Sequence, residues 1–239
     1  MNTPKYLIQN VEKYPNEPAL SIKDRSGSWK TDTWSEVYSS VLSVSKSLLA
    51  CGIKKHDKVS IYSYNRPEWN IGYMATQLIN GVAVGVYHTS SSNEVEWVVG
   101  NSESRIIFLG NNPNDNGEKE KMPNYRLLEV LDKLDKVELV ITMDGVEILK
   151  HPKIISWSEF IEKGKSVDDE TVQELCRQIQ SGDTSSLIYT SGTTGNPKGV
   201  MLSHGGILSN CEGAQEILNQ LVQNSEPTFL TWLPLSHSY

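Results

Sequence analysis

The sequence predicts an α/β fold in which mostly parallel sheets are covered by helices on both faces. Short apolar strands alternate with amphipathic helices along most of the chain, and several strands are apolar on both faces, as in a buried parallel sheet. The 239 residues, of which 38% are hydrophobic and 21% charged, suffice for a core without cross-links. Cys51, Cys176 and Cys211 lie far apart, which indicates buried reduced thiols instead of a disulfide framework or a zinc site.

The first predicted β-α-β unit follows a capped helix. That helix spans "TWSEVYSSVLSVSKSLLACG", where Thr33 and Glu36 have the spacing of a capping box and Gly52 stands at the C-terminal end. The unit itself consists of the strand "KVSIYSYN", the helix "RPEWNIGYMATQLING" and the apolar strand "VAVGV". We expect Pro67 to begin this second helix and Gly81 to end it.

The alternation of helices and strands continues to the end of the chain. "SSNEVEWVVGN", "YRLLEVLDKLDK" and "SWSEFIEKG" predict helices, with the strands "RIIFLG" and "VELVITMDG" between them, and residues 110–124 predict a solvated loop. A helix is expected from Asp168 to about Gln180, followed by the strands "SSLIYT" and "GVMLS", a helix from Gly205 to about Val222 and a last strand in "TFLTWLP". No internal repeat interrupts this pattern.

The charge and the chain's start limit the partners and the location. A formal net charge of −7 argues against nucleic acid or an anionic membrane as the main partner, because those surfaces favour Lys and Arg. The start "MNTPKYLIQN" has no apolar signal segment, and nowhere do 18 apolar residues follow one another. We therefore expect a cytoplasmic protein, with room for a peripheral membrane contact, that meets any anionic ligand through a local cluster of donors.

Such a cluster lies between two predicted strands in "YTSGTTGNPKGVMLSH", from Tyr189 to His204. Successive backbone N–H groups of a glycine-rich turn form an anion-binding nest, hydroxyl groups add donors, and a lysine adds positive charge. This donor set matches phosphate oxygens. The residues concerned are Gly192, Gly195, Gly199, Ser191, Thr193, Thr194 and Lys198.

Two simpler interpretations of this loop fit less well. Aligned with the P-loop of NTPases, the segment has Pro197 at the second glycine and Gly199 at the Mg²⁺-binding hydroxyl, and it leads into a strand instead of a helix. A plain hairpin turn needs only two to five residues and no cluster of hydroxyl groups with a lysine. No Gly-x-Ser-x-Gly segment occurs, which removes the usual hydrolase alternative.

The 16 residues from Tyr189 to His204 resemble the signature loop of the acyl-adenylate-forming (AMP-binding) superfamily. Within it, "TWSEVY", "NRPEWNIGYMATQLINGVAVGVYHTSSSNEVEWVVGNSESRIIF" and "WLPLSHSY" resemble the long-chain fatty acyl-CoA synthetases. The resemblance covers nearly the whole chain and is weakest from Gly110 to Lys165. It implies part of the large N-terminal domain, with residues 1–180 as a first α/β part and residues 181–239 as the phosphate-binding hairpin and the start of the next α/β part.

The resemblance also implies a two-step ligase that uses a fatty acid, ATP with Mg²⁺, and coenzyme A. It makes His237 in "PLSHSY" an acyl-pocket candidate, leaves Asn196, Pro197 and Gly199 to shape the loop, and assigns no catalytic residue or metal ligand within this chain. His204 is expected to cap or pack at the start of a helix. The triphosphate contacts that the resemblance implies are Thr190, Ser191, Gly192, Thr193, Thr194, Gly195 and Lys198.

Several features of such a synthetase are absent from these 239 residues: the Tyr-Gly-x-Thr-Glu stretch that helps to hold Mg²⁺, the Asp that binds the ribose, and the C-terminal domain with its adenylation Lys. We therefore expect an N-terminal portion that is inactive alone and self-associates through uncovered apolar surface. Two alternatives stay open. The same fold can activate another carboxylic acid, or the chain is a non-catalytic nucleotide-binding remnant.

Overall fold

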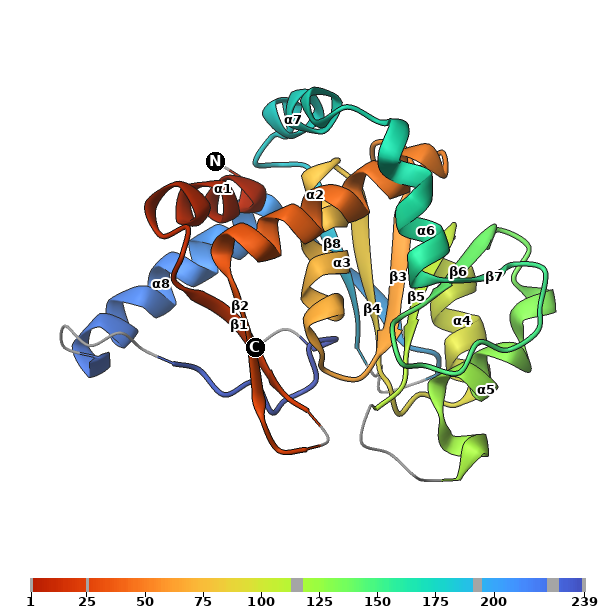
Figure 1. The fold of residues 1–239 in the computed structure, drawn as a ribbon. Coiled ribbons are helices and arrows are strands. Elements are labelled where there is room, and N and C mark those ends of the chain that lie inside the picture. The colour runs from red at the N-terminus through yellow and green to blue at the C-terminus, as the bar shows by residue number, and fades with distance from the viewer. Residues whose placement is uncertain (1, 25, 113–117, 191–194, 223–227, 238–239) are drawn as a thin grey trace.

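A computed structural model of the chain describes residues 2–24, 26–112, 118–190, 195–222 and 228–237. A seven-stranded sheet with the strand order β7-β6-β5-β3-β4-β8-β9 forms its centre (Figure 1). All neighbouring strands are parallel except β9, which is antiparallel to β8. The strands are β3 (Lys58–Ser63), β4 (Val82–Val86), β5 (Ile106–Gly110), β6 (Leu139–Thr142), β7 (Ile154–Ser156), β8 (Thr184–Thr190) and β9 (Lys198–Ser203).

Helices cover both faces of this sheet, and a separate antiparallel hairpin lies beside it. The hairpin consists of β1 (Pro18–Lys23) and β2 (Trp29–Thr33). The α-helices are α1 (Thr3–Lys13), α2 (Trp34–Ala50), α3 (Pro67–Leu78), α4 (Ser92–Ser102), α5 (Pro123–Leu128), α6 (Trp157–Lys163), α7 (Asp169–Gln178) and α8 (His204–Val222). Three 3₁₀ turns accompany them: η1 (Lys119–Lys121), η2 (Leu131–Lys133) and η3 (Gly164–Ser166).

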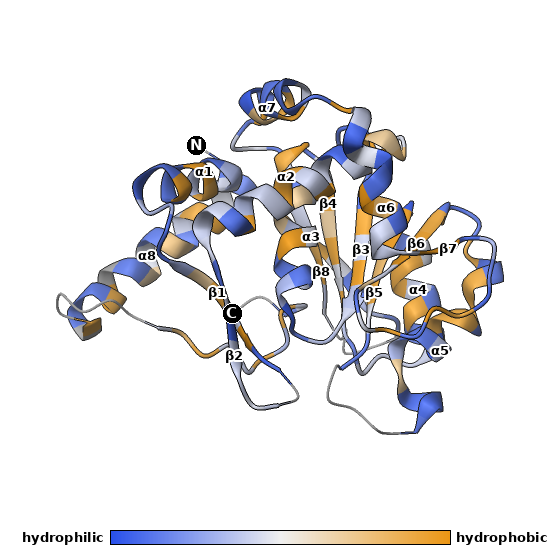
Figure 2. Cartoon of the chain, viewed as in Figure 1, coloured by the Kyte–Doolittle hydropathy of each residue, from blue (hydrophilic) through white to orange (hydrophobic). Residues whose placement is uncertain are grey.

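The strand β5 explains why the sheet needs cover on both sides. Ile106 and Phe108 belong to the core formed with α2, α3, α6 and α7, whereas Ile107 and Leu109 belong to the core formed with α4 and α5. Successive side chains of a strand point to opposite faces, so a strand buried on both faces is apolar throughout. Figure 2 shows this concentration of apolar residues in the central strands. The predicted fold class is confirmed.

The caps predicted for α2 are confirmed, and the end predicted for α3 differs in one residue. Thr33 accepts a hydrogen bond from the Glu36 backbone and Glu36 bonds back to the Thr33 N–H, which completes the capping box of α2, and Gly52 follows with a φ of 82°. After α3, however, Asn80 adopts the left-handed conformation, with a φ of 59°. Gly81 instead allows the chain to pass close to the backbone of α3, because a methyl group at this position would lie 3.0 Å from the Thr76 carbonyl oxygen.

Other local predictions were incomplete. The helix expected in "YRLLEVLDKLDK" ends at Leu128 and a 3₁₀ turn replaces its second half, which buries Leu127, Val130 and Leu131 together against the sheet. The sequence reading missed α1, the β1–β2 hairpin and β7. It also expected three buried thiols, whereas Cys211 is exposed on α8 and Cys51 is half-buried; the cysteines are free.

The last strand predicted, in "TFLTWLP", is wrong. Residues 228–234 form no strand; the carbonyl oxygens of Thr231 and Leu233 accept from the Asn65 side chain, and that of Pro234 accepts from the His237 N–H in a local turn. A strand needs a neighbouring strand to share its hydrogen bonds, and apolar composition alone does not supply one. Phe229, Leu230 and Trp232 are accordingly exposed.

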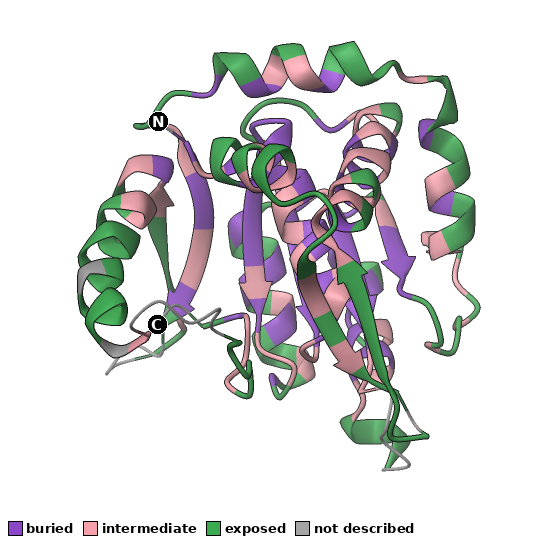
Figure 3. Cartoon of the chain, turned by 60° about the vertical axis from the view of Figure 1, so that its left-hand side comes forward, coloured by how far each residue is buried: buried purple, intermediate pink, exposed green. Residues whose placement is uncertain are grey.

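The phosphate-binding hairpin expected from the sequence is part of the central sheet. β8 pairs with β4, and β9 extends the sheet to an exposed edge (Figure 3). The central sheet therefore contains strands from both sides of residue 180. The division of the domain at that position stays a prediction. Among the described helices, none combines the length and the apolar character that crossing a membrane requires.

Candidate functional site

The candidate site lies at the carboxyl edge of the central sheet. β3, β4 and β8 are adjacent and parallel, so their carboxyl ends meet at one edge. In open α/β sheets, ligands bind at this edge. Asn65 follows β3, Tyr87 follows β4, and Thr190 ends β8.

The β8–β9 hairpin presents its polar residues at this edge. Thr190 and Lys198 are paired across the two strands, and both side chains are exposed. Gly195 has a φ of 109°, a conformation that L side chains rarely adopt, so glycine is favoured there. The structure thus brings Thr190, Gly195 and Lys198 to one end of the hairpin. The other predicted contacts lie outside the described residues: Ser191, Gly192, Thr193 and Thr194.

Helix α4 holds the base of this hairpin. The Trp97 indole N–H donates to the Pro197 carbonyl oxygen at 2.9 Å, and the Tyr189 hydroxyl lies 2.7 Å from Asn101 Oδ1, to which it donates. Tyr189 is buried, and that burial raises its pKa above the ordinary value. A methyl group at Gly199 would lie 3.0 Å from the Tyr189 ring, so this glycine makes room for the tyrosine. The loop is therefore anchored on the side opposite its exposed donors.

Sequence reasoning missed Trp97 and Asn101 as supports of the loop. They are four residues apart on α4 and therefore on one helix face, where each combines an apolar or short body with one polar end. That spacing was a usable signal. What the sequence does not give is the packing of this face against the hairpin, because the bond from Trp97 spans 100 residues.

The segment that carries His237 lies across the same edge. Ser236 is buried against Gly85 of β4, and a methyl group at Gly85 would lie 3.0 Å from the Ser236 Cα atom. Gly85 is paired with Ile188 of β8, two residues before Thr190. The His237 ring packs edge-on against Tyr87, with ring centroids 5.9 Å apart. The predicted acyl-pocket residue thus lies against the end of β4, and the predicted phosphate loop follows β8, the strand next to it.

Hydrogen bonds also fix the loop that follows β4. The buried Tyr62 hydroxyl donates to the Ser90 carbonyl oxygen at 3.0 Å, and Arg126 donates to the carbonyl oxygens of Thr89 and Ser90 at 2.8 and 3.0 Å. Burial raises the pKa of Tyr62 to about 12, so its hydroxyl stays protonated as a donor. Tyr87 therefore lies at the beginning of a loop that these hydrogen bonds hold in place.

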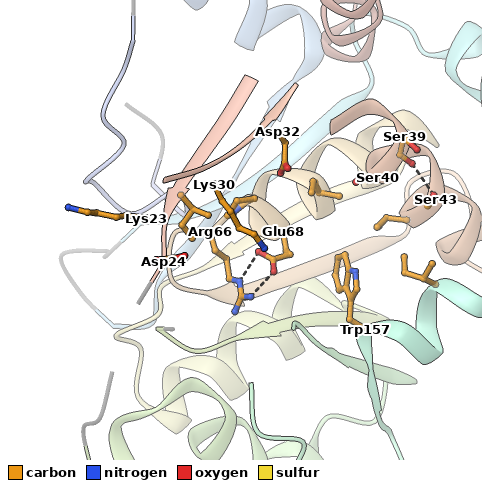
Figure 4. A pocket seen from close by; sticks show the side chains of 15 residues that line it. Lys23, Asp24, Lys30, Asp32, Ser39, Ser40, Ser43, Arg66, Glu68 and Trp157 are labelled. Carbon is orange, nitrogen blue, oxygen red and sulfur yellow. Dashed lines mark hydrogen bonds and ion pairs between the residues drawn. The ribbon is translucent and has the colours of Figure 1, made fainter. Parts of the chain in front are cut away.

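A cavity of about 580 Å³ lies away from this edge, between the β1–β2 hairpin, α2 and α3 (Figure 4). Its charged walls include both signs, with Lys23 and Lys30 on the hairpin near Asp24 and Asp32, and the Arg66–Glu68 ion pair below them. This balance does not match the charge of a polyphosphate. We therefore place the candidate nucleotide site at the β8–β9 hairpin and not in this cavity.

The donors at the hairpin fit a phosphorylated ligand better than they fit a bare metal ion. A hydroxyl, an ammonium group and the N–H groups of a glycine-containing turn are all donors, and phosphate oxygens are acceptors. In the described parts of the chain, His, Cys, Asp and Glu form no cluster of three that could hold a metal ion. The described residues at this edge therefore favour an anion.

Comparison with solved structures places the fold among CoA synthetases and ligases. An acetoacetyl-CoA synthetase from Streptomyces lividans is 25% identical, with a TM-score of 0.75 over 95% of this chain and 33% of that structure. The anthranilate CoA ligase AuaEII, solved in complex with anthranoyl-AMP, is 18% identical, with a TM-score of 0.67 over 85% of this chain and 35% of that structure, and it supports the fold alone.

The family follows from the sequence match. A model described as AMP-binding enzyme matches residues 7–239, and the chain belongs to this AMP-binding enzyme family. It is 28% identical over 238 residues to the mouse (Mus musculus) long-chain-fatty-acid–CoA ligase ACSBG2, covering 99% of this chain and 34% of that protein. It is 28% identical over 237 residues to the Arabidopsis thaliana long chain acyl-CoA synthetase 3, covering 96% of this chain and 34% of that protein. The chain thus spans about a third of the length of these relatives.

Proposed function

We propose that this chain is the N-terminal portion of a long-chain-fatty-acid–CoA ligase, an acid–thiol ligase. A carboxylate oxygen of the fatty acid attacks the α-phosphorus of ATP, and pyrophosphate leaves as the acyl-adenylate forms. The sulfur of coenzyme A then attacks the acyl carbonyl carbon, and AMP leaves as the thioester forms. The long-chain relatives support this acid class. Because the chain spans about a third of their length, the activity is proposed for the whole protein and these 239 residues are predicted to be inactive alone.

The observation that carries the proposal is the register of the β8–β9 hairpin. It places Thr190 opposite Lys198 at the carboxyl edge of the sheet, with Gly195 in a conformation that favours glycine between them. Negative charge accumulates on the departing pyrophosphate, and donors fixed beside it stabilise that transition state. The proposed triphosphate contacts are Thr190, Ser191, Gly192, Thr193, Thr194, Gly195 and Lys198.

His237 is the proposed boundary of the acyl pocket. Its support is the packing of its ring against Tyr87, directly after β4 and next to the strand that leads to Thr190. A fatty-acid carboxylate bound beside His237, at the end of β4, would lie next to a nucleotide bound at the end of β8. Bound Mg²⁺ would supply charge neutralisation to the phosphates of ATP, and we assign no described residue to it.

The location and assembly of the protein are also proposals. We propose a cytoplasmic enzyme that collects its acid in water or at a peripheral membrane contact, with no role in binding nucleic acid. The exposed side chains of Phe229, Leu230 and Trp232 support self-association of the 239-residue chain alone, since apolar surface of this kind favours contact with a second copy. Light scattering over a range of concentrations tests this, and a strictly monomeric chain contradicts it.

The direct test is ATP–pyrophosphate exchange, dependent on palmitate, by the full-length protein and its Lys198→Ala variant. We expect exchange to fall by about a hundredfold or more, because one positive charge at the leaving group is lost. Lys136→Ala is the matched control, since this exposed lysine precedes β6 at the opposite edge of the sheet. Unchanged exchange with Lys198→Ala refutes the role of the loop.

The same assay separates the two alternatives. A panel of short, medium, long and aromatic acids identifies the acid, and preference for a short or aromatic acid would replace the long-chain assignment while leaving the loop's role intact. A protein that binds ATP in a Lys198-dependent way but exchanges no pyrophosphate with any acid is the non-catalytic remnant. The 239-residue chain, assayed beside it with palmitate, ATP, Mg²⁺ and coenzyme A, is expected to give no acyl-CoA above a blank.

A further inference from the structure

One side chain after β3 holds a segment that lies far away in the sequence. Asn65 Nδ2 donates to the Leu233 carbonyl oxygen at 2.7 Å and to the Thr231 carbonyl oxygen at 3.3 Å. Its Oδ1 accepts from the Leu235 N–H at 2.9 Å. A primary amide carries the same donor and acceptor as a peptide group, so Asn65 pairs with this backbone as a neighbouring strand would. It supplies the partner that residues 228–234 find nowhere else in the described sheet.

A second contact seats the same segment from the side of β4. Gly85 faces Ser236, and a methyl group at this position would lie 3.0 Å from the Ser236 Cα atom, 3.0 Å from its carbonyl oxygen and 3.2 Å from its Cβ atom. Two of these atoms are backbone, which does not yield as a flexible side chain does. The contact therefore depends on glycine and requires the segment to lie directly on the strand.

The turn that carries Asn65 is itself fixed, on the side of the cavity that Arg66 and Glu68 line. Arg66 is buried, and its guanidinium donates to both carboxylate oxygens of Glu68, at 2.9 and 2.6 Å, as Figure 4 shows. The same guanidinium donates to the Asp144 carbonyl oxygen at 2.7 Å, which ties the turn to the end of β6. A bidentate ion pair of this kind fixes the orientation of the Arg66 guanidinium as well as stabilising it. We therefore infer that the position of Asn65 is set by its own turn, and that Asn65 in turn determines where the distant segment lies.

We propose that Asn65 is a positioning residue for the acid-binding side of the site, with Gly85 as its steric counterpart. Together they seat residues 231–237 across the carboxyl ends of β3 and β4, and this sets the place of His237 against Tyr87. Neither residue contacts the reacting atoms in this account. The inference rests on the proposed function only for the identity of the ligand, since the seating itself can be measured without one.

The first test measures the seating by amide hydrogen exchange on the 239-residue chain. Asn65→Ala and Gly85→Ala are each expected to speed exchange of the Leu235 amide by about tenfold, the first by removing its acceptor and the second by pushing the segment off β4. Asn65→Asp keeps an oxygen that accepts from the Leu235 N–H but loses the donor to two carbonyl oxygens. Exchange of the Leu235 amide should therefore speed up less in Asn65→Asp than in Asn65→Ala. Strand amides of β5 report whether each variant is still folded.

Two matched controls accompany these variants. Asn70 is a half-buried asparagine of α3 that makes no side-chain hydrogen bond within the described chain, so Asn70→Ala should leave Leu235 exchange unchanged. A methyl group at Gly100 would meet only Leu134 Cδ2 at 3.8 Å, so Gly100→Ala should also leave it unchanged. Unchanged Leu235 exchange in both folded test variants overturns the seating.

The second test uses the full-length protein and compares the two substrates. If Asn65 positions the acid side, Asn65→Ala raises the KM for palmitate in pyrophosphate exchange by about tenfold and leaves the KM for ATP unchanged. A KM for palmitate equal to that of wild type, despite faster Leu235 exchange, overturns the positioning role. This outcome is distinct from failure of the proposed function, which would appear as wild-type exchange activity in Lys198→Ala.

Discussion

Acidification is predicted to destabilise the chain through one histidine, His204, at the first position of α8. Its side chain is fully buried, and its Nδ1 atom lies 2.7 Å from the Thr3 hydroxyl. Nδ1 also accepts from the Thr3 backbone N–H at 3.4 Å, and the Thr3 hydroxyl donates its own proton to Gln77 Oε1 at 2.8 Å. A protonated ring carries an N–H on both nitrogens, so Nδ1 would meet the Thr3 N–H, and Nε2 is buried without a hydrogen-bond partner in the described chain. The neutral ring is therefore strongly favoured.

The magnitude follows from the difference between the folded and the unfolded chain. Burial lowers the pKa of His204 from 6.5 to about 4, and the nearby Asp183 carboxylate opposes the shift without cancelling it. Between these values the unfolded chain binds a proton that the folded chain does not, so the free energy of unfolding falls as the pH falls through this window. One pKa unit corresponds to about 1.4 kcal/mol, so the full loss approaches about 3 kcal/mol near pH 4.

Urea unfolding followed by circular dichroism, from about pH 7.5 to about pH 4.5, measures this loss. The control is His204→Gln, whose amide offers both a donor and an acceptor to Thr3 and does not titrate. Other groups that titrate in acid, such as the capping carboxylates Glu36 and Glu159 with their lowered pKa values, are common to both proteins and cancel in the comparison. We expect the wild-type protein to lose about 2 kcal/mol more than the variant. Parallel stability curves would refute this account of His204.

Three further predictions concern the core and the hairpin. Phe108→Ala should lower the free energy of unfolding by about 3–5 kcal/mol in denaturant titration, because this ring is fully buried between α3 and α6, whereas Phe229→Ala, at an exposed site, should change it by less than about 0.5 kcal/mol. Tyr189→Phe should cost about 1 kcal/mol by removing the bond to Asn101, and a nucleotide titration of the full-length protein should show weaker ATP binding. Gly195→Ala should weaken ATP binding in the same titration without lowering the stability of the sheet by more than about 1 kcal/mol, since the strain at a φ of 109° falls on an exposed turn.

The parts of the fold that the sequence predicted are those with a local cause. The capping box at Thr33 and Glu36 requires residues three positions apart, and the two-sided burial of β5 appears as an unbroken apolar run. The failures have a cause at long range. "TFLTWLP" has the composition of a strand, but its backbone pairs with the side chain of Asn65, and the second half of "YRLLEVLDKLDK" tightens into a 3₁₀ turn to bury its side chains against the sheet.

The candidate site divides in the same way. Its donors are contiguous, from Thr190 to Lys198, because a backbone nest must be built from successive N–H groups, and a contiguous set is readable from sequence. Its supports are not contiguous, because a loop that faces a ligand on one side can be held only from the other. Trp97 reaches the hairpin across 100 residues, and Asn65 reaches the His237 segment across 170. A substitution at either support should therefore weaken ligand binding while leaving every residue of the signature loop in place.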